Sequence, residues 1–87
     1  MPASPLFDLT GTAALVTGGN GGIGRGIALG LAAAGASVMV AARNAEKNAA
    51  VLAELRALGG RAEAVACDVL DGASIEAAVA ATVDAFG

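Results

Sequence analysis

Short apolar runs, each bounded by glycine or polar residues, form the first pattern along the chain. They predict strands at residues 13–17, 37–41 and 61–67. The first two runs are apolar on both faces, which is typical of strands buried inside a parallel sheet. The third run alternates at first and then turns apolar, and this also indicates a strand.

Between and after these runs, apolar residues recur every three or four positions, as on one face of a helix. The pattern predicts helices at residues 23–34, 44–58 and 71–86. Their apolar faces are expected from Ile23, Ile27 and Leu31 in the first, Leu52, Leu55 and Leu58 on the inner face of the second, and Ile75, Val79, Val83 and Phe86 in the third. Asn44 and Asp71 are expected to cap the second and third helices, and Gly35 to end the first.

Strands that alternate with helices predict an α/β fold, with a parallel sheet and right-handed crossovers. The chain has 87 residues and shows no internal repeat or linker, so a single small domain is expected. A chain of this size buries only about 60% of the surface that it exposes when unfolded. Its stability is therefore expected to be marginal.

Composition excludes several classes of function. Apolar residues make up 56% of the chain and aromatic residues 2%, which favours helices packed closely on a sheet over an aromatic-rich core. The net charge is -3 and the basic residues are scattered, so no patch for a nucleic-acid backbone is expected. There is no histidine and Cys67 is the only cysteine, so neither a zinc site nor an internal disulfide is predicted.

The same features predict a cytoplasmic protein. The N-terminal segment has neither the positive start nor the apolar stretch of a signal peptide. The uncharged run at residues 26–42 is shorter than the ~20 apolar residues of a membrane span, and Gly30 and Gly35 interrupt it. Cys67 is interpreted as a small buried hydrophobe, because no cationic residue lies next to it in the sequence to make the thiol reactive.

Five glycines within seven residues follow the first predicted strand, at residues 18–24. Between a strand and a helix, such a loop lets the backbone approach a pyrophosphate, with the N–H groups of the helix start facing the negative charge. The dinucleotide pattern G-x-G-x-x-G fits Gly19, Gly21 and Gly24, but a tight turn without a ligand is the alternative. The mononucleotide P-loop pattern fails, because Arg25 and Gly26 stand where it needs lysine and a hydroxyl.

A third pattern, T-G-x-x-x-G-x-G, is matched by Thr17, Gly18, Gly22 and Gly24. With it, the chain resembles the short-chain dehydrogenase/reductase family from about residue 9 to residue 87. Further matches follow in the family's order: the apolar strand before the loop, Gly35, Arg43 and the segment Cys67-Asp68-Val69.

The resemblance implies a Rossmann-type, three-layer fold. Residues 1–87 would be a partial NAD(P)-binding domain, the β-α-β-α-β-α half of a doubly wound fold with strand order 3-2-1. Members of the family transfer hydride between a nicotinamide cofactor and a carbonyl or alcohol. A non-catalytic module that binds a dinucleotide or pairs with another chain, and a non-functional fragment, are the alternatives.

The implied cofactor contacts come from the glycine loop and from the ends of the second and third strands. They are Thr17, Gly18, Asn20, Gly21, Gly22, Ile23, Gly24, Arg43, Asn44, Asp68 and Val69. By resemblance, Asp68 contacts the adenine amino group and Val69 packs on the ring. The alternative role for Asp68 is to bind N–H groups of its own loop.

Arg43 favours NADP(H) over NAD(H). In nucleotide-binding folds an acid after the second strand binds the ribose hydroxyls, whereas an arginine there accommodates a 2′-phosphate. This chain has Ala42 and Arg43 at that place and no acid. Many NADP-using relatives also carry a basic residue in the loop, where this chain has Gly21. The alternative for Arg43 is an ion pair with Glu46.

No catalytic residue can be assigned. The family uses a tyrosine, a lysine four residues later, a serine and an asparagine, but this chain has no tyrosine and its only lysine is Lys47. We expect the catalytic groups to lie beyond these residues. In the family a fourth strand pairs with the first, so without it the first strand is expected to be an exposed apolar edge that promotes self-association.

Overall fold

The computed structural model describes residues 8–18 and 21–87. Strands and helices alternate along the chain in the predicted order, and each predicted bound is within one residue of the observed one. The elements are β1 (Ala13–Thr17), α1 (Gly22–Ala33), β2 (Ser37–Ala42), α2 (Ala45–Ala57), β3 (Ala62–Ala66) and α3 (Gly72–Phe86).

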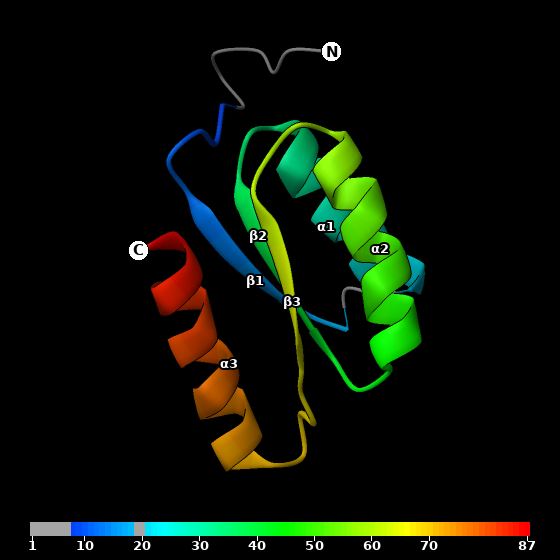
Figure 1. The fold of residues 1–87 in the computed structure, drawn as a ribbon, viewed down its shortest axis with the longest axis vertical. Helices are drawn as coiled ribbons and strands as arrows, with labels where there is room; N and C mark the ends of the chain where they lie inside the picture. The colour runs from blue at the N-terminus through cyan, green and yellow to red at the C-terminus, as the bar shows by residue number, and fades with distance from the viewer. Residues whose placement is uncertain (1–7, 19–20) are drawn as a thin grey trace.

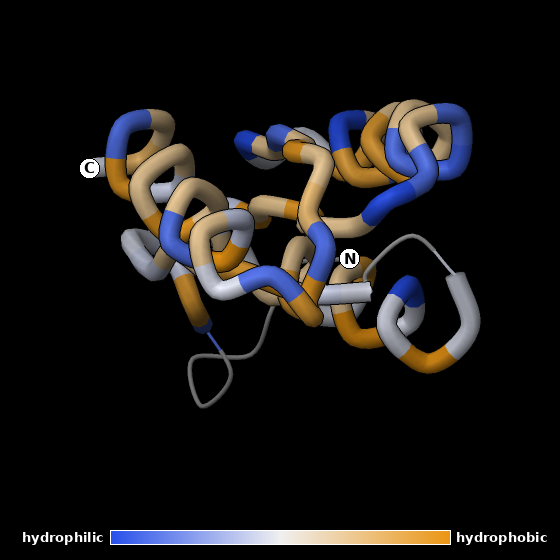
Figure 2. The backbone as a smooth tube through the Cα atoms, turned by 90° about the horizontal axis from the view of Figure 1, so that it is seen from below, coloured by the Kyte–Doolittle hydropathy of each residue, from blue (hydrophilic) through white to orange (hydrophobic). Residues whose placement is uncertain are grey.

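The strands form one parallel sheet in the order β1-β2-β3, which confirms the expected order. Figure 1 shows α1 and α2 on one face of the sheet and α3 on the other. Figure 2, seen from below, separates the same layers, with α3 ending at the C label on one side and α2 on the other. The molecule is therefore the expected three-layer α/β sandwich.

The core is centred on β2, because it is the only strand of the described sheet with a neighbour on each side. Val38 and Val40 of β2 are fully buried, whereas β1 and β3 are mostly half-buried or exposed. Val51 and Leu55 of α2 pack against the same cluster. β1 is an edge strand within the described chain, as expected.

In α1 and α3 the buried residues are alanines, whereas α2 buries Asn48, Val51 and Leu55. The buried residues of α1 are Ala28 and Ala32, and that of α3 is Ala78. Small side chains let a helix approach the sheet closely, so the larger residues are displaced to the outer faces.

The expected apolar faces therefore need correction. Ile23, Ile27, Ile75, Val79 and Val83 are exposed, Ile23 by 84%. The remaining residues of these expected faces are less exposed: Leu31 is half-buried and packs against the core, and Phe86 is half-buried.

On α2, the expected inner face is correct for Leu55 and partly for Leu52, which is half-buried. It is wrong for Leu58, which is 49% exposed. Leu58 is the C-cap, where the backbone leaves the helix, so its side chain no longer follows the buried face.

The predicted helix ends are confirmed. Asn44 and Asp71 cap α2 and α3 with their side chains. Gly35 follows α1 with φ of 102°. A Cβ at Gly35 would lie 2.9 Å from Thr10 Oγ1, so both the backbone conformation and the space require glycine there.

Candidate functional site

The parallel strands bring three loops to one edge of the sheet. Gly18 N–H donates to Ala41 O at 2.9 Å, and Cys67 N–H donates to Ala42 O at 3.1 Å. These bonds extend the ladder past the strand ends. The glycine loop, the Arg43 turn and the Asp68 turn therefore lie in adjacent positions. In open parallel sheets, this carboxyl edge is where ligands bind.

The start of α1 is open. Its N-cap, Gly21, is extended (φ −171°) and makes no side-chain capping bond, and the first turn holds no acidic residue. Gly18 and Gly22 have positive φ values of 67° and 56°, which other residues rarely adopt. Among the described residues, no atom beyond the chain neighbours lies within 4 Å of a Cβ built on Gly18, Gly21 or Gly22. The N–H groups of this helix end are thus available to an anion.

The remaining residues of the expected loop site are placed as follows. Thr17 ends β1 and is exposed, while Ile23 and Gly24 lie in the first turn of α1. Asn20 falls outside the described residues, as does Gly19 of the dinucleotide pattern.

Arg43 and Asn44 form the turn between β2 and α2. Asn44 Oδ1 accepts a hydrogen bond of 2.9 Å from Lys47 N–H, so its side chain serves the helix. Arg43 is exposed. The alternative ion pair with Glu46 is not found: within the described residues, the ion pairs are Arg25–Glu54 and Arg56–Glu63. The guanidinium of Arg43 is therefore available at the edge.

Asp68 is half-buried and already holds its own loop. Its Oδ1 accepts a 2.9 Å hydrogen bond from Leu70 N–H, and its backbone N–H donates to Ser74 Oγ at 2.9 Å. The local role expected as the alternative is thus real for one carboxylate oxygen. Oδ2 has no hydrogen bond to any part of the chain that the structure describes. Val69 follows with half of its surface exposed.

Sequence reasoning missed Asn48. Its side chain is 5% exposed, and its Nδ2 donates to Ala42 O at 2.9 Å. Asn48 shares the buried face of α2 with Val51 and Leu55. A polar residue three and seven positions before buried apolar residues is the signal that could have identified it.

Arg25 follows the glycine loop directly but is engaged elsewhere. Its Nε donates to Glu54 Oε1 at 3.0 Å, and its Nη2 pairs with Oε2. The hydrogen bond from Arg25 lowers the pKa of Glu54, and the same bond raises the pKa of Arg25. Both side chains are about 40% exposed, so the pair is a weak tie between α1 and α2.

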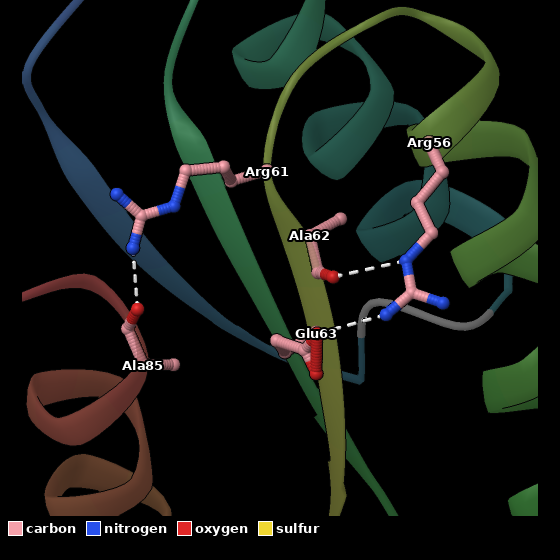
Figure 3. Close-up of polar contacts among 5 residues, drawn as sticks. All are labelled: Arg56, Arg61, Ala62, Glu63 and Ala85. Carbon is pink, nitrogen blue, oxygen red and sulfur yellow. Dashed lines mark hydrogen bonds and ion pairs between the residues drawn. The ribbon is translucent and has the colours of Figure 1, made fainter.

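An open cavity of about 580 Å³ lies at the amino end of β3, away from this edge. Figure 3 shows its arginines: Arg56 donates to Ala62 O at 3.2 Å and to Glu63 Oε1 at 2.8 Å, and Arg61 donates to Ala85 O. The Arg61 guanidinium lies 5.3 Å from the centre of the Phe86 ring. The Arg61 contacts hold the end of α3 beside the start of β3, and the Arg56 contacts tie α2 to β3, so we assign this cavity a structural role despite its size.

Cys67 is buried beside Ala41 and Ala78, as expected for a small hydrophobe. Within residues 8–18 and 21–87, no helix is long and apolar enough to cross a membrane. The same residues contain no group of three or more His, Cys, Asp or Glu side chains that could hold a metal ion.

Known proteins with this sequence pattern are numerous. Residues 12–87 match the family model described as short chain dehydrogenase. A 2,5-dichloro-2,5-cyclohexadiene-1,4-diol dehydrogenase from Sphingobium indicum is 46% identical over 79 residues, which cover 91% of this chain and 32% of that protein.

Solved structures of similar proteins share this fold. A dehydrogenase/reductase from Sinorhizobium meliloti 1021 is 45% identical with a TM-score of 0.89, covering 93% of this chain and 32% of that one. A 7α-hydroxysteroid dehydrogenase, solved with NADH and 7-oxo glycochenodeoxycholic acid, is 37% identical with a TM-score of 0.89 and the same coverage. The chain therefore spans about a third of the length of the relatives that it matches.

Proposed function

The chain belongs to the short chain dehydrogenase family, and we propose that it forms the dinucleotide-binding part of an NAD(P)-dependent oxidoreductase. Residues 1–87 would be a partial NAD(P)-binding domain. The observation that carries this proposal is the open start of α1, which lies at the carboxyl edge of a parallel sheet and follows a glycine-rich loop. Backbone N–H groups and the helix dipole favour a pyrophosphate there.

The residues at this edge suit each part of the cofactor. The loop and the first turn of α1 would hold the pyrophosphate, and the Asp68 turn would hold the adenine. Asp68 Oδ2 is available for an amino group, because only Oδ1 is used by Leu70. The proposed contacts are Thr17, Gly18, Asn20, Gly21, Gly22, Ile23, Gly24, Arg43, Asn44, Asp68 and Val69.

NADP(H) is the proposed form of the cofactor. Arg43 is exposed at the end of β2 and makes no ion pair with Glu46. A planar guanidinium binds a phosphate through paired, charge-assisted hydrogen bonds. The chain has no acid at this place that would instead bind free ribose hydroxyls.

The proposed reaction is hydride transfer to or from a carbonyl or alcohol substrate, with the bound cofactor supplying or accepting the hydride. The role of this chain is to bind and orient that cofactor. The chain has no tyrosine or histidine, so we propose that the acid/base group comes from outside these residues.

Calorimetric titration of the folded chain with NADPH, and with NADH as the comparison, tests the proposal. Saturable binding that is tighter for NADPH is expected. Binding that favours NADH would overturn the assignment of Arg43. No binding of either nucleotide, by a chain whose circular dichroism shows it folded, would overturn the cofactor site as a whole.

We also propose that the isolated chain associates through β1. This strand pairs only with β2 in the described sheet, so one row of its N–H and C=O groups is unpaired. Such an edge favours pairing with another chain. Sedimentation velocity is expected to show dimers or larger species, whereas a single monomeric boundary over a wide concentration range would contradict this.

A cytoplasmic location is the last part of the proposal. Its support is the free, buried Cys67, because a thiol without a disulfide partner suits a reducing compartment. Fractionation of cells that express the protein with its native start is the test.

A further inference from the structure

One carbonyl oxygen joins two of the turns at the candidate site. Ala42 is the last residue of β2, and its carbonyl accepts hydrogen bonds from both Asn48 Nδ2 at 2.9 Å and Cys67 N–H at 3.1 Å. Arg43 follows this carbonyl directly, and Asp68 follows Cys67. The position of Ala42 O is therefore shared by the Arg43 turn and the Asp68 turn.

The bond from Asn48 closes the Arg43 turn into a ring. It spans residues 42–48, and a second bond from Lys47 N–H to Asn44 Oδ1 lies inside it. Asn48 N–H also donates to Asn44 O at 2.9 Å, as the first helical bond of α2. The backbone that carries Arg43 is thus held at both ends by groups of α2.

The other side chains that line the hollow beside Asn48 are apolar, so packing there does not by itself require an amide. It lines a hollow of about 220 Å³ whose other lining residues are Ala45, Ala49, Leu52, Ala64, Val65 and Ala66. A buried amide costs free energy unless it is hydrogen-bonded, while an apolar side chain of similar size would fill the same place without that cost. The amide of Asn48 is therefore better explained by its hydrogen bond to Ala42 O than by the space that it fills.

We propose that Asn48 is a positioning residue, which holds the Arg43 turn in place for the 2′-phosphate of NADP(H). The inference rests on the proposed function, because it needs Arg43 to meet that phosphate. Asn48 itself does not touch the cofactor. Asn48 acts through Ala42 O on the backbone of Arg43. It therefore affects the preference for NADPH over NADH more than the binding of the groups that both cofactors share.

The test compares Asn48→Leu with Val51→Ala, a matched change one turn along the same buried face. Asn48→Leu is expected to weaken NADPH binding about tenfold, the loss typical of one buried hydrogen bond, while NADH binding stays within about twofold. Its melting temperature is expected to stay within about 4 °C of the parent, because leucine fills the apolar hollow. Val51→Ala is expected to melt lower and to keep the NADPH preference, because it leaves the turn intact.

If Asn48→Leu weakens the binding of NADPH and NADH equally, or weakens neither, the preference for NADPH is unchanged and the inference is overturned. A fall in melting temperature as large as that of Val51→Ala, with no change in preference, would make Asn48 a stabilising residue only.

Amide hydrogen exchange separates this inference from the proposed function. Asn48→Leu is expected to speed exchange at Lys47 N–H, which lies in the Arg43 turn, whereas Val51→Ala leaves this amide slow relative to the rest of α2. Cys67 N–H keeps its partner Ala42 O in both variants and serves as the internal reference. If the parent chain binds neither nucleotide, the proposed function fails and the 2′-phosphate role of Asn48 fails with it. Exchange then still decides whether Asn48 orders the turn, and unchanged rates would overturn that as well.

Discussion

The starts of the three helices face the same edge of the sheet, but they are built in two ways. At α2 and α3 a side chain from the N-cap accepts a hydrogen bond from the helix: Asn44 from Lys47 N–H and Asp71 from Ala73 N–H. At α1 the N-cap is Gly21, which has no side chain to offer. Two helix starts are capped by side chains of the chain itself, and the start of α1 has no side-chain cap.

The absence of a side-chain cap at α1 accords with the anion site proposed for this helix start. A glycine N-cap forgoes roughly a few tenths of a kcal/mol of stability relative to Asp or Asn. It also leaves N–H donors directed at open space, where the chain places no acidic residue in the first turn. A negative group from outside would supply the acceptor that α2 and α3 find in their own side chains.

Gly21→Asp is expected to have the largest effect, because it gives the start of α1 the side-chain cap that α3 has. Gly21 is extended, and within the described part of the chain a Cβ there would meet no atom beyond its neighbours within 4 Å, so we expect aspartate to fit. We expect the melting temperature to rise and NADPH binding to weaken about hundredfold, since the carboxylate occupies the N–H donors and repels the pyrophosphate. Calorimetric titration and thermal melts measure both, and Gly21→Ala is the control. Retained binding in Gly21→Asp would show that this helix end is not the phosphate site.

Arg43→Leu removes the cation on the turn next to the uncapped start of α1. NADPH binding is expected to weaken roughly 10- to 100-fold, because one or two charge-assisted hydrogen bonds are lost. NADH binding is expected to stay unchanged. Arg56→Leu, at the opposite end of the sheet, is the control and should alter neither affinity. An equal loss for both nucleotides would contradict the role of Arg43 at the 2′-phosphate.

Asp71→Ala tests whether the side-chain cap of α3 stabilises the helix without affecting nucleotide binding. It removes the acceptor for Ala73 N–H, which lies 3.0 Å from Asp71 Oδ1. The free energy of unfolding is expected to fall by about 1 kcal/mol, with nucleotide affinity unchanged, because this cap serves the helix alone. Urea denaturation and titration of the variant check the two parts. A large loss of NADPH binding would mean that the α3 start also contributes to the site.

Glu54→Gln gives the smallest expected effect, through the pair that ties α1 to α2. The hydrogen bond from Arg25 lowers the pKa of Glu54 from its ordinary 4.5. A carboxyl with a lowered pKa in the folded state stabilises the fold above pH 4.5 and loses that effect as pH falls through the folded value. Melting temperatures of parent and variant are thus expected to differ slightly near pH 7 and to converge in acid. A constant difference at every pH would exclude the ion pair as its cause.

Much of the fold could be predicted from local patterns. Strand and helix bounds follow from apolar spacing, and the caps at Asn44 and Asp71 follow from residue type, because each depends on neighbours within a few positions. The glycine loop and Arg43 were also found this way. Their meeting at one edge follows from the parallel order of the strands.

The helix faces could not be predicted as well. Apolar spacing identifies a stripe such as Ile75, Val79 and Val83, but it does not say whether the stripe or the alanines beside it meet the sheet. The structure buries Ala28, Ala32 and Ala78 instead. That choice depends on how closely each helix approaches the sheet, which is a property of the packed whole.

The sequence by itself thus determined the elements, their order and the uncapped glycine start of α1, since these depend on backbone preferences and short-range bonds. Tertiary structure alone decided that Asn48 meets Ala42 O, that Arg25 turns to Glu54, and that Arg43 makes no such pair. The contacts of Asn48 and Arg25 each join two different elements, so they form only once the helices and the sheet have packed together.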